Sequence, residues 1–118
     1  MGNYATWGDV TARYQKAATK VDADEMQDSY IAGAEGLMNA YLTKKFTTPV
    51  TGKPPLLEDI CVDLTYCKLA FNQDKGVPKL KDAAMAMLKD IASGELLLTD
   101  SDGVALDDVV SAAVFITP

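Results

Sequence analysis

Residues 41–71 constrain the fold more than any other stretch, because a basic, proline-containing elbow at residues 43–54 separates two amphipathic segments there. The proline and glycine residues of the elbow are typical of a loop. Pro55 follows the elbow and suits the first position of a helix, where its missing N–H costs no hydrogen bond. The apolar residues that follow recur with a helical period: Leu57, Ile60, Cys61, Leu64, Cys67 and Phe71. The stretch therefore predicts two helices that are joined by a loop.

A short helix is expected near the N-terminus. Thr6 can cap it, and Asp9 lies three residues later, where an acidic side chain completes a capping box. The helix should run to about Tyr14 or Lys16, with Val10 and Tyr14 facing inward because they are four residues apart.

A longer helix should follow, since Asp22 and Asp24 provide the acidic start that the positive end of a helix dipole favours. Its predicted apolar stripe is Met26, Tyr30, Ala34, Leu37 and Tyr41. Gly33 and Gly36 lie inside this helix and lower its stability, so we expect another backbone to cross closely there.

A fourth helix is expected from Pro78, which suits a first helical turn, to Gly94, which suits a C-terminal cap. Its predicted stripe is Leu80, Ala84, Met87, Leu88 and Ile91. The expected fold is therefore mainly α, with a small four-helix domain at residues 1–94.

The last part of the chain, residues 95–118, differs in character. Residues 96–99 could form a short strand, residues 100–103 are a turn signal, and residues 109–116 are rich in β-branched side chains. A four-helix core does not need these residues. We expect a partly extended C-terminal arm, with β-structure as one option, that packs on another subunit.

The composition argues against an enzyme. Histidine is absent, which removes the usual proton-transfer side chain near neutral pH, and no nucleophile or phosphate-loop motif is present. Cys61 and Cys67 lie about 240° apart around a helix, so they cannot pair with each other. Without histidine they form no zinc set, and we expect two buried thiols and no cofactor.

Charge and hydropathy limit the partners. A net charge of −6 argues against binding through nucleic-acid phosphates. No apolar run approaches the length of a transmembrane helix, and the first residues lack the basic and apolar regions of a signal peptide. We therefore expect no membrane association.

Two charged groups have more than one interpretation. Asp59 and Asp63 could bind a divalent cation or meet Lys44 and Lys45 of a neighbouring protomer, although a solvated helix face is the favoured interpretation. The two lysines, with Lys53, could touch DNA or an acidic neighbour, or simply provide solubility.

Trp7 could anchor a partner, but closing the first helix onto the core is favoured. Together these considerations give a set of candidate residues for a protomer or partner interface: Trp7, Lys44, Lys45, Phe46, Asp59, Asp63, Leu96, Leu98, Val109, Val114, Phe115 and Ile116.

Several segments resemble one family. These are YATWGDVTARY at residues 4–14, the helix end at residues 41–42 with the elbow residues Phe46, Thr48 and Pro49, the helix at residues 57–69, and AMLKDIASGELLL at residues 86–98. They resemble the head–tail connector proteins (adaptor or head-completion proteins) of tailed phages, including Mu-like phages and related prophages.

The resemblance implies a structural protein of the virion, present in the host cytoplasm before assembly. Such proteins form a ring, typically dodecameric, beneath the portal, and the ring joins the portal to the tail or to a stopper protein. DNA passes through the channel only as cargo. The segment after Thr99 does not align with the family pattern, so the role of the arm follows from its composition.

Two other functions stay open. A small acidic all-α phage or prophage protein could instead bind a host protein as an inhibitor, through one exposed apolar patch. A DNA-binding regulator with a helix-turn-helix at residues 17–32 is disfavoured by the negative charge and by Arg13 being the only arginine.

Overall fold

The computed structural model describes residues 4–15, 24–46, 48, 50, 54–69, 76–96, 98 and 99, and of residues 24–28 it describes the backbone alone. It contains four helices: α1 (Trp7–Arg13), α2 (Asp24–Leu42), α3 (Pro55–Leu69) and α4 (Val77–Ser93). These described residues contain no β-strand. The prediction of a mainly α, four-helix domain is confirmed.

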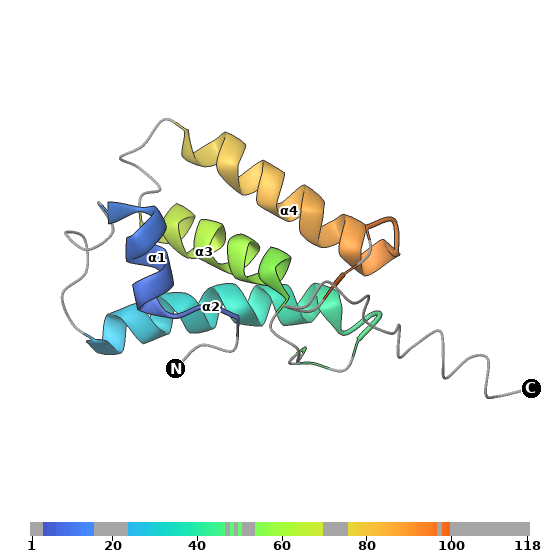
Figure 1. Ribbon diagram of the computed structural model, residues 1–118, viewed down its shortest axis with the longest axis horizontal. Coiled ribbons are helices and arrows are strands. Elements are labelled where there is room, and N and C mark those ends of the chain that lie inside the picture. The colour runs from blue at the N-terminus through green and yellow to red at the C-terminus, as the bar shows by residue number, and fades with distance from the viewer. Residues whose placement is uncertain are drawn as a thin grey trace, which may run out of the picture.

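Helix α3 lies at the centre of the bundle and contacts each of the other three helices. Figure 1 shows α2 and α4 on either side of α3, each running in the opposite direction to it, with α1 crossing near one end. This arrangement explains the burial of α3. In addition to the predicted stripe as far as Cys67, it buries Val62, Thr65 and Tyr66. A helix covered from three sides has no broad polar face.

Helix α1 begins as its sequence predicts. The Thr6 hydroxyl accepts a hydrogen bond from the backbone N–H of Asp9, and the Asp9 carboxylate accepts one from the N–H of Thr6. The helix ends at Arg13, and Tyr14 is its C-terminal cap. Val10 is fully buried and Tyr14 half-buried, so both face inward as expected.

The predicted stripe of α2 is displaced by about one position. The buried residues of this helix are Ile31, Ala34, Glu35, Met38 and Leu42. Leu37 and Tyr41 are half-buried and pack at the edge of the core. The difference arises because α2 contacts both α3 and α4, which cover a wider arc than one stripe.

The close backbone crossing that we expected at the two α2 glycines is not present. Gly36 has open space where a Cβ would lie. At Gly33 the nearest group is the ammonium end of the Lys68 side chain from α3, not a backbone. A flexible side chain, and no helix crossing, therefore occupies the space that Gly33 leaves.

Helix α4 closes with a glycine in the left-handed region. Gly94 has φ = 88°, and its N–H donates to the carbonyl of Ile91 at 3.2 Å. The N–H of Leu96 donates to the carbonyl of Asp90 and so satisfies a second carbonyl at the helix end. Both the predicted start near Pro78 and the predicted Gly94 cap are confirmed.

The beginning of the predicted arm belongs to the helical core. Leu98 is 2% exposed and Leu96 packs against the same cluster. Our expectation that the core does not need these residues is therefore wrong for Leu96 and Leu98. The predicted strand is also not formed there, since Thr99 makes only an isolated bridge.

Candidate functional site

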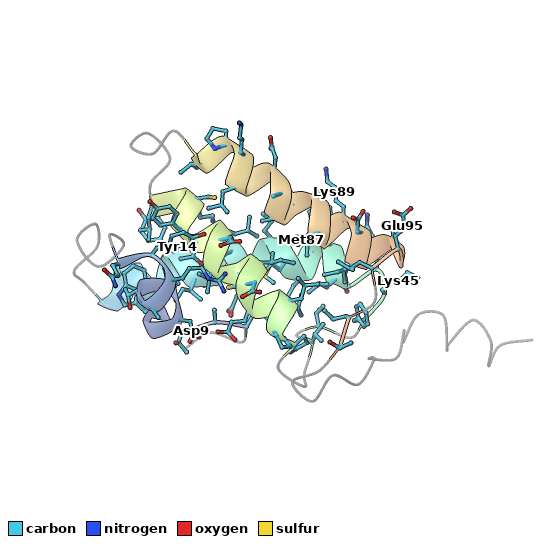
Figure 2. The ribbon with its side chains drawn as sticks, turned by 45° about the horizontal axis from the view of Figure 1, so that its top comes forward. Asp9, Tyr14, Lys45, Met87, Lys89 and Glu95 are labelled. Atoms are coloured by element: carbon cyan, nitrogen blue, oxygen red, sulfur yellow. The ribbon has the colours of Figure 1, made fainter. Side chains whose placement is uncertain are left out.

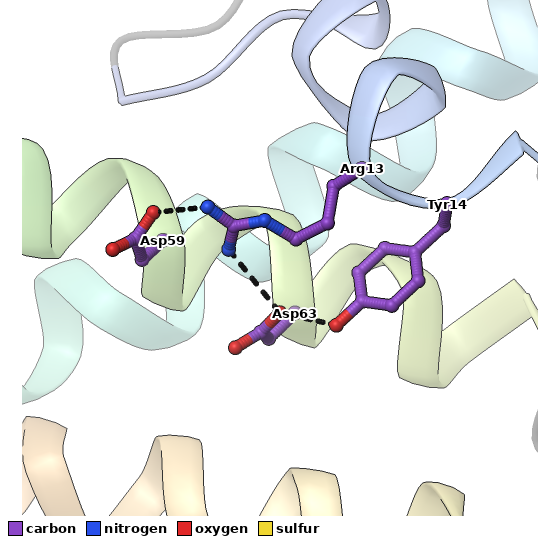
Figure 3. A network of polar contacts seen from close by, with 4 residues as sticks. All are labelled: Arg13, Tyr14, Asp59 and Asp63. Carbon is purple, nitrogen blue, oxygen red and sulfur yellow. Dashed lines mark hydrogen bonds and ion pairs between the residues drawn. The ribbon is translucent and has the colours of Figure 1, made fainter.

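The most strongly polar constellation among the described residues joins α1 to α3 (Figure 3). One Arg13 nitrogen pairs with Asp59, and the other lies 3.5 Å from Asp63. The Tyr14 hydroxyl donates a 2.6 Å hydrogen bond to the same Asp63 carboxylate. We call these four residues the Arg13 clasp. Asp59 and Asp63 are one helical turn apart, so both carboxylates face the end of α1.

The clasp gives the two aspartates different surroundings. The Asp59 side chain is 47% exposed, whereas the Asp63 side chain is only 14% exposed. A solvated face is therefore wrong for Asp63, whose carboxylate has two partners within its own chain. No three histidine, cysteine, aspartate or glutamate side chains gather to hold a metal ion anywhere in the described part of the chain.

Tyr14 of the clasp also stacks against Tyr66 of α3. The rings of Tyr14 and Tyr66 are parallel within 9°, and their centroids lie 4.1 Å apart. Burial raises the pKa of the Tyr14 hydroxyl, and its hydrogen bond to Asp63 raises that pKa further. Tyr14 therefore stays a neutral hydrogen-bond donor well above neutral pH.

A second network is buried and was missed at the level of sequence. The backbone N–H of Tyr4 donates a 2.7 Å hydrogen bond to Glu35, and the Tyr4 hydroxyl donates to Asn39. The same hydroxyl accepts a hydrogen bond from the N–H of Val50 at 3.0 Å. We call this the Tyr4 network. It fastens the N-terminal segment and the elbow to α2.

One feature of the sequence, the position of Glu35, could have indicated the Tyr4 network. Glu35 is 6% exposed and lies between Ile31 and Met38, on the face of α2 that is otherwise apolar. A carboxylate in such a position needs a buried donor. Burial also raises the pKa of Tyr4, while the hydrogen bond from Val50 opposes that rise.

The elbow lysines have separate intramolecular positions. The Lys44 ammonium lies 5.6 Å from the centroid of the Tyr41 ring, within the range of a cation–π contact. Lys45 extends to the C-terminal end of α4, near Glu95 in Figure 2, and its ammonium lies against Gly94. A positive charge at this end of a helix is favourable because the helix dipole is negative there.

The remaining candidate residues fall into two groups. Trp7 and Phe46 are half-buried and pack against the core, as Leu96 does, and this agrees with the favoured interpretation of Trp7. Val109, Val114, Phe115 and Ile116 lie outside the described residues. The structure thus brings together Asp59 and Asp63, and it places the elbow lysines elsewhere.

Both cysteines are buried, as predicted, and no disulfide joins them. Burial and the nearby Glu35 carboxylate raise the pKa of the Cys61 thiol to about 12. A thiol in that state is a poor nucleophile at neutral pH. Among the described helices, none has the length and apolar character needed to cross a membrane.

Comparison with known proteins identifies the family. A family model described as "Bacteriophage Mu, Gp36" matches residues 4–112, which include all four helices. A search of curated proteins gives no significant match. The matched region covers nearly the whole chain, so the chain belongs to the bacteriophage Mu Gp36 family and is a phage protein.

Proposed function

We propose that this phage protein is a head–tail connector subunit, which forms a homo-oligomeric ring beneath the portal in the virion. DNA would pass through the ring, and the tail or a stopper protein would bind its other side. The observation that carries the proposal is the phage-family match along a four-helix domain. The resemblance of residues 4–98 to connector proteins supports the specific role.

The polar contacts favour a structural role and not a catalytic one. Asp59 and Asp63 are the kind of paired carboxylates that can perform acid–base chemistry. Here they hold α1 against α3 through Arg13 and Tyr14. The Tyr4 network likewise joins segments of the bundle. Both networks support a rigid building block.

The outer face of α4 suits contacts between copies. Its exposed side chains carry charges of both signs: Lys79, Asp82, Lys89 and Asp90. Identical subunits in a ring bind through two different patches, which must be complementary to each other. A surface of mixed charge can set the register of such a contact.

The test is the solution mass of the full-length protein, alone and mixed with the portal protein of the same phage, by light scattering. We expect a ring, or a complex that forms only with the portal, and electron microscopy should show an annular particle. The portal of an unrelated phage is the control. A monomer that ignores its own portal would contradict the proposal and favour the host-protein inhibitor.

A further inference from the structure

A cleft of about 400 Å³ opens between α2 and α4, with α3 as its floor. Among the described residues, the side chains that line it are Tyr30, Leu37, Leu64, Cys67, Lys68 and Lys81. We call it the three-helix cleft. Its volume is within the range of sites that bind small ligands or a few side chains of a partner. A partner that covers the apolar side chains of the cleft would lower the free energy of the complex, since burying apolar area is stabilising.

Two lysines give the cleft a positive rim. Lys68 and Lys81 are both exposed, and neither has an ion-pair partner among the described residues. Lys68 lies across the gap toward Gly33, which has no side chain to exclude it. In a chain with a net charge of −6, two exposed lysines beside an apolar cleft indicate an occupant that is apolar and acidic.

The C-terminal part of this chain has that chemistry. Asp107 and Asp108 directly precede VVSAAVFI at residues 109–116, in which only Ser111 is polar. Two adjacent carboxylates could meet the two lysines, while the valine and phenylalanine side chains enter the apolar part of the cleft. This segment therefore matches both the apolar walls of the cleft and the positive charge of its rim.

We propose that the three-helix cleft binds residues 107–116 of a second copy of this chain. Leu98 is held in the core, and the nine residues 99–107 could span roughly 30 Å when extended, enough to reach an adjacent subunit. An arm in a cleft is a contact between two different patches, as ring closure requires. The proposal rests on the proposed ring, and it names the contact that closes it.

The test is a disulfide between two chains. One full-length protein carries Leu37→Cys with Cys67→Ser, so that the only thiol in the cleft is the new one. The other carries Val114→Cys with Cys67→Ser and a longer tag. The proteins are mixed with and without portal and oxidised mildly. We expect a disulfide-linked pair that contains one chain of each size.

Two controls define the background. Lys89→Cys replaces Leu37→Cys in the first control, because Lys89 is exposed on the outside of α4 (Figure 2). In the second, the cleft protein carries Lys68→Glu with Lys81→Glu, which should lower the yield of the mixed pair roughly tenfold. Adding Asp107→Lys with Asp108→Lys to the arm protein should restore the yield. Circular dichroism checks that every variant keeps its helices.

Three results would overturn the proposal. The first is a mixed pair no more abundant than with Lys89→Cys. The second is a yield that the charge reversals leave unchanged. The third is a disulfide that forms only within one chain when Leu37→Cys and Val114→Cys are combined, since the arm would then fill its own cleft. If a ring forms but no mixed disulfide is found, the arm–cleft contact is wrong and the proposed function still stands. The absence of any ring or portal complex would instead count against the function.

Discussion

The Arg13 clasp and the Tyr4 network fasten different segments to the same bundle, but in opposite environments. The clasp uses full charges at the surface, where Asp59 is about half exposed. The Tyr4 network uses one buried carboxylate, a hydroxyl, an amide and two backbone N–H groups. Water competes for the first set of groups, whereas the hydrogen bonds to Glu35 and from Val50 in the second set are buried. The number of charges in a contact is therefore a poor guide to its contribution to stability.

The largest expected effect comes from Tyr4→Phe. The substitution keeps the ring and removes the hydroxyl that serves Asn39 and the N–H of Val50. We expect a loss of about 2 kcal/mol in the free energy of unfolding, because buried polar groups would lose their partner. Urea unfolding followed by circular dichroism measures it. Tyr30→Phe, at a half-buried tyrosine of the cleft, is the matched control and should change stability by much less.

Gly94→Ala tests a third contact, between Lys45 of the elbow and the C-terminal end of α4, in which shape matters more than charge. A Cβ at Gly94 would meet the Lys45 ammonium, and φ = 88° is unfavourable for alanine. We expect a loss of about 1–2 kcal/mol in the free energy of unfolding. Adding Lys45→Ala should recover only the steric part. Full recovery in the double variant would show that the backbone conformation costs nothing.

Within the clasp, the two aspartates should differ. Asp63→Asn should lower the free energy of unfolding by about 1 kcal/mol, because Asp63 is mostly covered and also accepts from Tyr14. Asp59→Asn should cost less than about 0.5 kcal/mol, since exposed ion pairs contribute little. Salt should weaken the contribution of Asp59 more than that of Asp63. Equal costs for the two variants would contradict this view of the clasp.

Alkaline pH should distinguish Cys61, which lies near Glu35 of the Tyr4 network, from Tyr14 of the clasp, by an effect that is absent at neutral pH. Cys61, beside Glu35, has its pKa raised from 9.0 to about 12. The folded protein then keeps a proton that the unfolded chain releases, so this contribution to stability is present below pH 9.0 and is lost as the pH rises toward about 12.

The tyrosine of the clasp should act at higher pH. The pKa of Tyr14 is raised from 10.0, so its contribution declines only above that pH. We expect stability in urea to fall from about pH 9 in the parent protein, and only from about pH 10 in Cys61→Ala. Tyr14→Phe should reduce the slope above pH 10. Identical pH profiles for all three proteins would contradict the assignment.

Much of the local structure could be predicted from the sequence. The Thr6 and Asp9 capping box, the start of α3 at Pro55 and the Gly94 cap each depend on residues within one or two helical turns. The inward face of α3 was also predicted, because its apolar period is regular. The displaced stripe of α2 and the absent helix crossing at Gly33 and Gly36 were not, since they depend on which helices cover α2.

The candidate site shows the same division. The sequence places Asp59 and Asp63 on one face of a helix by spacing alone, but it names no partner for them. Arg13 lies 46 residues from Asp59 in the chain, and Tyr4 lies 46 residues from Val50. No local pattern connects positions so far apart.

The sequence by itself determined where the capped helices begin and end and which face of α3 and of α4 is apolar, because capping and periodicity act between near neighbours. Only the tertiary structure decided that α3 is the central helix, that Leu98 belongs to the core, and that Glu35 is buried beside Tyr4. The physical reason is that burial depends on what covers a side chain. In this bundle, the covering groups come from helices that are distant in the sequence.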